Sequence, residues 1–168
     1  TGGSVSGLYR RTEDSDTWEL CEAITGTHVH AIAVHPEDPA VVYAATSKGL
    51  LRSEDRGTSW IRVVEPEGGE QMWSVLFHPN KPRTILAGSA PLGLHRSDDG
   101  GRTFKRMPRP KVAERMVGAF PSRIMRMGIA PHHPASRTME AALPVHGLSD
   151  ERARSFRYVA RPEYRSLW

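Results

Sequence analysis

The chain has 168 residues, of which 38% are hydrophobic and 25% charged, a composition that excludes a collagen-like or low-complexity protein. No stretch approaches the ~20 consecutive apolar residues of a membrane span, so no membrane partner is expected. The single cysteine, Cys21, excludes an internal disulfide and is typical of a reducing compartment, which predicts a cytoplasmic location.

The net charge of +4 conceals two halves of opposite sign. Residues 1–100 contain nine Lys and Arg against 14 Asp and Glu, whereas residues 101–168 contain 14 against five. A basic half raises the question of nucleic-acid binding. Its arginines are scattered among Pro, Met and Ala, without the aromatic residues on which bases stack. A solvated basic surface is therefore the favoured interpretation, and nucleic acid is not an expected partner.

Two sequence elements repeat in register along the chain. The first begins with Gly-Leu in its clearest copies and ends in an aromatic residue, at 7–18, 49–60 and 93–104, with a worn copy at 149–156. The second contains a His-Pro-x-x-Pro turn or its relative and leads into a short β-type run, at 31–45, 74–88 and 126–142. The recurring histidines of this turn, His35 and His78, are interpreted as turn residues.

Each repeat unit predicts four short strands, because β-branched and aromatic runs alternate with Gly and Pro turns. In the first complete unit we expect strands at 28–34, 40–45, 49–53 and 59–64. A period of ~40–50 residues with four strands is typical of a propeller blade. The sequence therefore predicts an all-β fold, a β-propeller of four-stranded antiparallel blades.

The predicted propeller is incomplete, with about three and a half blades. We expect one partial propeller over 1–159 and a C-terminal tail at 160–168, the propeller being divided into a half blade at 1–26 and blades at 27–66, 70–108 and 122–159. Propellers usually close with four to eight blades. Such an arc is expected to need missing blades or a partner chain to cover its free sheet edges.

The aromatic-ended segments share the pattern Ser-x-Asp-x-Gly-x-Thr-Trp/Phe, which has a mechanical explanation. An Asp side chain accepts hydrogen bonds from backbone N–H groups just downstream, and the Gly adopts a positive φ. The pattern resembles the Asp box, or BNR repeat, of sialidase-like propellers, including bacterial proteins described as "glycosyl hydrolase" BNR-repeat propellers. The matching residues are Ser53, Asp55, Gly57 and Trp60 in one copy and Ser97, Asp99, Gly101, Thr103 and Phe104 in the next.

The resemblance implies that these turns are structural and lie on the rim away from the ligand-binding face, so Asp55 and Asp99 are not expected to be catalytic acids. At the opposite rim, where the first strand of each blade begins, the repeat register aligns residues that a core does not require. The candidate ligand-binding residues there are His28, His30, Gln71, Trp73, Arg123 and Arg126. The alternative, that they line a water-filled channel, stays open.

No metal and no cofactor is expected, because the pair His28 and His30 lacks an identifiable third ligand. No catalytic residues can be assigned either. Most glycosidases use two carboxylates and sialidases a Tyr nucleophile, and no third arginine can be assigned beside Arg123 and Arg126. The sequence thus favours a non-catalytic propeller module that binds a protein or a glycan. The alternative, which rests on the resemblance, is part of a glycoside hydrolase of the exo-sialidase type.

Overall fold

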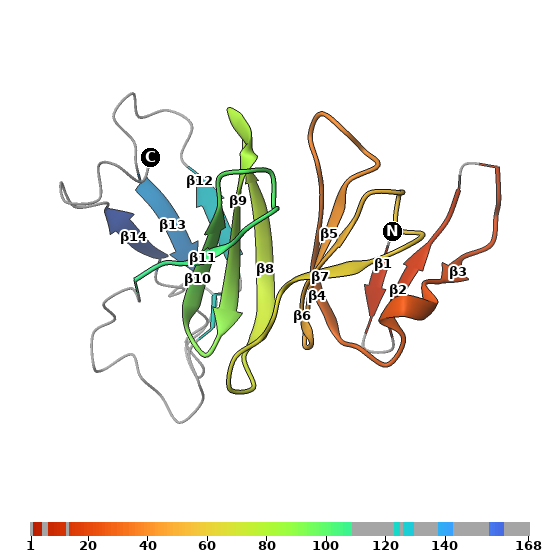
Figure 1. Ribbon diagram of the computed structural model, residues 1–168, viewed down its shortest axis with the longest axis horizontal. Helices are drawn as coiled ribbons and strands as arrows, with labels where there is room; N and C mark the ends of the chain where they lie inside the picture. The colour runs from red at the N-terminus through yellow and green to blue at the C-terminus, as the bar shows by residue number, and fades with distance from the viewer. Residues whose placement is uncertain are drawn as a thin grey trace.

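The computed structural model describes residues 2–4, 7–12, 14–108, 123–124, 126–129, 138–142 and 155–159. This part of the chain is all-β, as the repeats predict, and its strands form four antiparallel sheets that stand side by side in chain order (Figure 1). A short 3-10 helix, η1 (Glu22–Ile24), is the helical element among these residues. No helix in the described ranges is long and apolar enough to cross a membrane.

The second and third sheets are four-stranded meanders in which each strand pairs with the next. The second sheet consists of β4 (Val29–Val34), β5 (Val42–Thr46), β6 (Gly49–Ser53) and β7 (Ile61–Val64). The third consists of β8 (Gln71–His78), β9 (Lys81–Ala90), β10 (Gly93–Ser97) and β11 (Lys105–Arg106). Both sheets therefore have the strand order expected of a propeller blade.

The first and fourth sheets each have three strands within the described residues. The first consists of β1 (Gly2–Ser4), β2 (Gly7–Arg10) and β3 (Glu19–Leu20). The fourth consists of β12 (Arg126–Ile129), β13 (Thr138–Ala142) and β14 (Ser155–Val159). Strand β1 was not expected in the half blade, and it forms because Gly3 and Ser4 continue an antiparallel ladder opposite Leu8 and Gly7.

The strand order expected over 122–159 is corrected by the described strands. Strand β14 pairs directly with β13, with Ser155 opposite Ala142 and Val159 opposite Thr138. It thus occupies the edge of β13 at which a preceding strand was expected. The worn copy of the motif before Ser155 and the predicted tail at 160–168 lie outside the described residues.

Strand ends differ from the predicted bounds where side chains capture backbone N–H groups. Strand β5 begins at Val42 and not at residue 40, because the N–H of Ala40 donates to Asp38 Oδ1 at 3.0 Å. Strand β7 begins at Ile61 and not at residue 59, because the N–H of Ser59 donates to Asp55 Oδ1 at 2.8 Å. Local hydrogen bonds of this kind compete with the sheet ladder.

The histidines of the two His-Pro turns have a structural use. His35 Nδ1 accepts the N–H groups of Glu37 and Asp38, and His78 Nδ1 accepts the N–H of Asn80. Burial lowers the pKa of His78, which favours the neutral ring, whose Nδ1 can accept a hydrogen bond. These contacts agree with the interpretation of both histidines as turn residues.

Apolar side chains from alternate strand positions pack between successive sheets. Between the first and second sheets lie Leu8, Cys21, Ile24, Ala44 and Leu51, and Trp60 packs against them. Between the second and third lie Tyr43, Ala45, Leu50, Val64, Met72, Phe77, Ile85 and Ala87, and Phe104 packs against that cluster. Trp60 and Phe104, the final aromatic residues of two copies of the repeat, thus each pack against a core shared with the preceding sheet.

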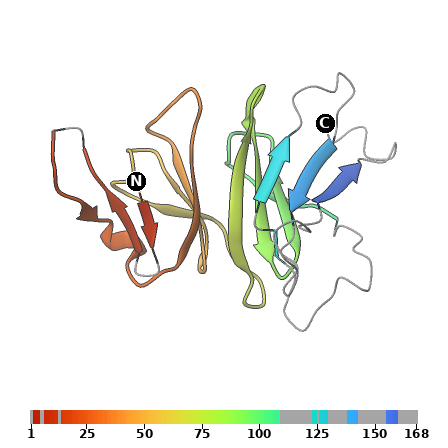
Figure 2. The ribbon, with the colours of Figure 1, turned by 180° about the vertical axis from the view of Figure 1, so that it is seen from behind.

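The first strands of the sheets lie next to one another. Strand β8 contacts β4 on one side and β12 on the other, and β4 also contacts β1. Seen from either side, the four sheets form a row with β8 between the second and the fourth (Figures 1 and 2). The beginnings of β4, β8 and β12 are thereby brought to one region of the molecule.

Candidate functional site

Two of the candidate residues sit at β-bulges. The pairing of β4 with β5 shifts register between Val29 and Ala31, which leaves His30 as the extra residue. The pairing of β8 with β9 shifts between Met72 and Ser74, which leaves Trp73 as the extra residue. His30 and Trp73 are equivalent in the sequence repeat, so the bulge itself is repeated. A bulge re-aims the side chain it carries and is over-represented next to functional sites.

The re-aimed side chains stack on one another. The rings of His30 and Trp73 lie 3.9 Å apart between centroids and within 9° of parallel. The guanidinium carbon of Arg123 lies 4.4 Å from the centroid of the Trp73 ring, within the range of a cation–π contact. The ring of His28 lies 6.4 Å from that of His30. We call His28, His30, Gln71, Trp73 and Arg123 the strand-entrance cluster.

Arg123 is held in place through its neighbour Ile124, whose side chain is buried. The N–H of Ile124 donates to the carbonyl of Ser89 at 3.2 Å, and the Ser74 hydroxyl donates to the carbonyl of Ile124 at 2.7 Å. Gly88 leaves room for this segment, since a Cβ there would lie 2.6 Å from the Cβ of Ile124. The third sheet therefore fixes the backbone from which Arg123 reaches Trp73.

The charge of the strand-entrance cluster comes from Arg123. Burial lowers the pKa of His30, and the charges of His28 and Arg123 lower it further, whereas the side chain of Gln71 opposes the shift. His30 is thus neutral at neutral pH. His30 Nε2 and Trp73 Nε1 are both buried and have no hydrogen-bond partner among the described residues. The cluster combines one fixed cation with two unsatisfied ring nitrogens.

A second polar cluster lies beside the first and was not predicted from the sequence. The carboxylate of Glu70 is only 2% exposed. It accepts a hydrogen bond from the Ser89 hydroxyl at 2.5 Å and forms an ion pair with Arg106 at 3.2 Å. His95 Nε2 lies 3.5 Å from the same oxygen, and burial lowers the pKa of this histidine. The one sign of this cluster in the sequence is His95, which stands where the preceding repeat unit has Leu51.

The Glu70 cluster contains Ser, Glu and His, but its geometry does not form a nucleophilic site. Ser89 is fully buried, and the Glu70 carboxylate contacts both the serine and the histidine, so no imidazole activates the hydroxyl. Ser89 also accepts the N–H of Ile124 through its carbonyl. The cluster therefore supports the segment that carries Arg123.

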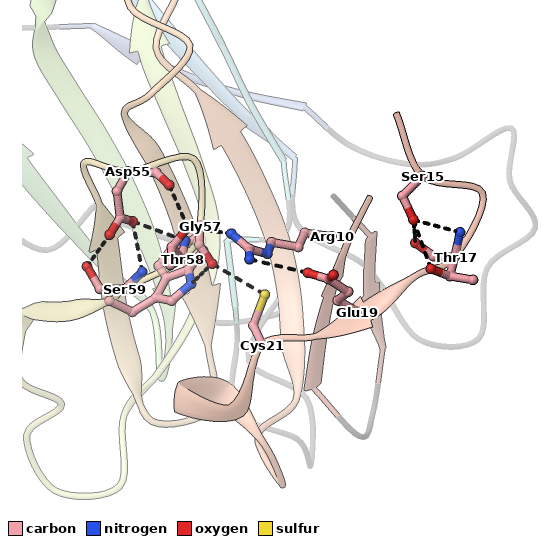
Figure 3. A network of polar contacts seen from close by, with 10 residues as sticks. Arg10, Ser15, Thr17, Glu19, Cys21, Asp55, Gly57, Thr58 and Ser59 are labelled. Atoms are coloured by element: carbon pink, nitrogen blue, oxygen red, sulfur yellow. Dashed lines mark hydrogen bonds and ion pairs between the residues drawn. The ribbon is translucent and has the colours of Figure 1, made fainter. Parts of the chain in front are cut away.

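The Ser-x-Asp-x-Gly turns lie at the far ends of the sheets. Ser53 donates to Asp55 at 2.8 Å and accepts the N–H of Gly57. Asp55 also accepts the N–H groups of Thr58 and Ser59 and the Ser59 hydroxyl (Figure 3). These donors lower the pKa of Asp55 to about 2. Both carboxylate oxygens are thus engaged inside the turn.

The next turn has the same contacts. Ser97 donates to Asp99 at 2.8 Å, and Asp99 accepts the N–H groups of Arg102 and Thr103 and the Thr103 hydroxyl. These hydrogen bonds hold the pKa of Asp99 well below its usual range. In both turns the glycine has the positive φ that the motif predicts, 86° at Gly57 and 83° at Gly101.

The structure describes the remaining candidate, Arg126, only in part. Arg126 begins β12, and its side chain lies outside the described residues. The described residues contain no group of three or more His, Cys, Asp and Glu side chains that could hold a metal ion. The structure thus brings together five of the six predicted ligand-binding residues.

No family model and no curated protein sequence matches this chain. Solved structures do match it. One is an ancestral GH74 enzyme, with a TM-score of 0.65 and 20% identity over 84% of this chain and 20% of that chain. Another is the GH74 xyloglucanase from Xanthomonas campestris, with a TM-score of 0.54 and 18% identity over 83% of this chain and 25% of that chain.

A solved structure from a different class of protein is about as similar to this chain. The structure of YCF48 bound to D1 peptide matches with a TM-score of 0.59 and 14% identity over 94% of this chain and 45% of that chain. At these identities the likeness establishes the fold alone. The chain has the fold of a β-propeller, and it spans between a fifth and somewhat under half of the length of these structures.

Proposed function

We propose that the chain is a β-propeller module that binds a protein or glycan ligand without catalysis. The observation that carries the proposal is the strand-entrance cluster. Two equivalent bulges turn His30 and Trp73 into a stack, and buried hydrogen bonds from a third sheet place Arg123 over the same ring. Side chains that only fill a core would not need a repeated bulge and a neighbouring sheet to hold them in this arrangement.

The carboxylates support a binding role over a catalytic one. Glycoside hydrolysis of the common type needs two carboxyl groups on either side of the scissile bond. Asp55 and Asp99 are each satisfied within a turn, and Glu70 is buried against Arg106 and Ser89. In our proposal the two turns are Asp boxes that stabilise the rim, and the strand entrances contact the ligand.

The chemistry of the cluster favours an anionic group on the ligand. A guanidinium binds carboxylates and related anions through paired N–H donors. His28 is exposed, with its ring 6.4 Å from that of His30, and the repeat assigns Arg126 to the same face. A bound peptide in the YCF48 structure supports a protein ligand, and the xyloglucanase supports a glycan.

Calorimetric titration of the purified chain tests the proposal. The probes are an acidic peptide of alternating Glu and Gly, sialyllactose and a xyloglucan oligosaccharide. We expect saturable binding of at least one probe, at least tenfold weaker after Arg123→Ala or Trp73→Ala. Arg62→Ala is the matched control, because Arg62 lies on the outer strand β7 and pairs with the exposed Glu65. Loss of binding in Arg62→Ala alone, or no binding of any probe, would contradict the proposal.

Part of a glycoside hydrolase is the second candidate function, because both GH74 structures share the fold. Aryl glycosides, including a sialoside, and xyloglucan are the test substrates. The binding proposal expects no turnover of any of them. Saturable hydrolysis that disappears in Arg123→Ala and Arg126→Ala would favour the hydrolase instead.

A further inference from the structure

The titratable side chains of the strand-entrance cluster are all bases. Arg123 holds a permanent positive charge over the ring of Trp73, and the rings of His28 and His30 lie 6.4 Å apart. Histidine is the side chain whose charge ordinarily changes between about pH 5 and pH 8, so each ring can add a positive charge beside that of the arginine. The cluster thus gathers one fixed cation and two proton acceptors in one place.

No carboxylate balances these bases within the described part of the chain. None of the ion pairs found there includes a residue of the strand-entrance cluster. The carboxylates that precede β8 are engaged elsewhere, because Glu67 and Glu70 both pair with Arg106. The described residues thus leave the positive charge of the cluster uncompensated, as is expected of a site that binds an anion.

The strands packed around His30 add no negative charge to it. Strand β1, which contacts β4, is Gly2–Ser4 and contains no titratable side chain. Strand β5 ends opposite the beginning of β4, and the charged residue that follows it is Lys48, an exposed cation. Strand β8 faces the ring with uncharged side chains, and the segment before β12 adds the positive charge of Arg123. Protonation of His30 therefore adds a cation to a site that is already positive.

The surroundings of His30 act on its proton in opposite directions. Burial lowers the pKa of the ring, and the charges of His28 and Arg123 lower it further, which keeps the ring neutral at neutral pH. The stack on Trp73, at 3.9 Å between centroids, favours the charged ring, because the face of an indole attracts a cation. An anion bound beside the two other bases would offset their charges and allow His30 to take up a proton.

We propose that the strand-entrance cluster binds a dianionic oxyanion group and takes up a proton on His30 as it does so, which makes binding tighter in acid. The inference rests on the proposed function, since it gives the charge of the ligand and the pH dependence of the same site. Two negative charges match Arg123 and a protonated His30. By linkage, the affinity rises as the pH falls through the range in which His30 titrates, and it levels off once the ring is protonated.

Calorimetric titration of the full chain with sodium sulfate, at constant ionic strength, tests the inference. Sulfate is a suitable probe because its own charge does not change between pH 5.5 and pH 8. We expect saturable binding that is about fivefold tighter, or more, at pH 5.5 than at pH 8. At pH 6.5, titrations in two buffers of different ionisation enthalpy should show net proton uptake on binding. An NMR titration should give His30 a higher pKa with sulfate than without it.

His30→Phe separates the proton from the stack. Phenylalanine keeps a flat ring against Trp73 but cannot be protonated, so this variant should lose most of the pH dependence of sulfate binding. His35→Asn is the matched control, because His35 lies in a turn at the far end of the sheet and an amide oxygen can still accept the N–H of Glu37. The control should keep the pH dependence of the parent chain.

Three results would overturn the inference: no sulfate binding at pH 5.5, an affinity that does not change with pH, or an undiminished pH dependence in His30→Phe. Sulfate binding that is lost in Arg123→Ala but does not vary with pH would leave the proposed binding function intact and remove only its coupling to a proton. Proton-coupled sulfate binding without binding of any peptide or glycan probe would contradict the proposed function instead.

Discussion

The two ends of the second and third sheets differ in how strictly they repeat. At the turn end, Ser53 and Ser97 each lie 2.8 Å from the aspartate two residues on, and the final hydroxyl of each turn lies 2.6 Å from that aspartate. At the strand-entrance end, the equivalent positions hold His30 in one sheet and Trp73 in the next. The backbone bulge repeats at these positions, but the side chain does not.

This difference separates stability from recognition. A turn must satisfy the same backbone groups in every blade, so the same side chains recur. A ligand contacts each strand entrance differently, so different side chains can occupy one backbone position. If this is right, substitutions at the turn end destabilise the fold, and substitutions at the strand-entrance end change binding with little effect on stability.

Gly101→Val has the largest expected effect. Gly101 has a φ of 83°, and a Cβ there would lie 1.7 Å from the hydroxyl of Tyr43 and 3.2 Å from Ile85. Backbone strain of about 1–3 kcal/mol adds to overpacking of about 1–3 kcal/mol, so we expect a loss of about 4 kcal/mol in urea denaturation.

Gly100→Ala is the matched control for Gly101→Val. Gly100 also has a positive φ, 77°, but a Cβ there meets nothing within 4 Å. Only the conformational cost of about 1 kcal/mol is expected. Equal losses in the two variants would show that contact with the preceding sheet does not matter.

Trp60→Ala is expected to cost about 3 kcal/mol, at the low end for a buried Trp, because the ring is half-buried against the first-sheet core. The variant also loses the hydrogen bond from the indole N–H to the carbonyl of Gly57 at 3.0 Å. Urea midpoints check the prediction, with the neighbouring exposed Ile61→Ala as control. A loss of stability no greater than that of the control would show that Trp60 does not contribute to the core.

The turn aspartates predict an acid-dependent loss of stability. The pKa of Asp55 is lowered from 3.8 to about 2 in the fold, so its contribution is complete above pH 3.8 and is lost as the pH falls through about 2. Asp55→Asn should lower the melting temperature at pH 6, and the difference from the parent should shrink between pH 4 and pH 2. Asp38→Asn, in another turn, controls for general acid effects. A pH-independent difference would contradict the turn role.

Sequence reasoning predicted more of the fold than of the site. The strand at 49–53 and the strand order of the second and third sheets follow from residues that repeat, since Gly, Pro and Asp have local conformational reasons to recur. The expected strand order of the fourth sheet was wrong, since β14 pairs directly with β13 and the choice of edge is non-local.

At the site, the repeat register showed that His30 and Trp73 occupy equivalent positions, although it could not show the bulges. The stack itself and the buried Glu70 cluster were not predictable. They depend on how three sheets approach one another, which no local pattern in the sequence records. Of that cluster, only the replacement of Leu51 by His95 in the repeat is visible in the sequence.

Arg123→Gln has the smallest expected effect on stability. Its guanidinium is half-buried over Trp73, and a cation–π contact of this kind contributes about 0.5–1 kcal/mol, so the urea midpoint should hardly move. Burial is the main cause that lowers the pKa of His30 and the positive charge of Arg123 adds to it, so removal of that charge should raise the pKa slightly in an NMR titration. Arg62→Gln on β7 should leave the His30 titration unchanged. A loss above about 2 kcal/mol would mean that the strand entrance serves the fold and not the ligand.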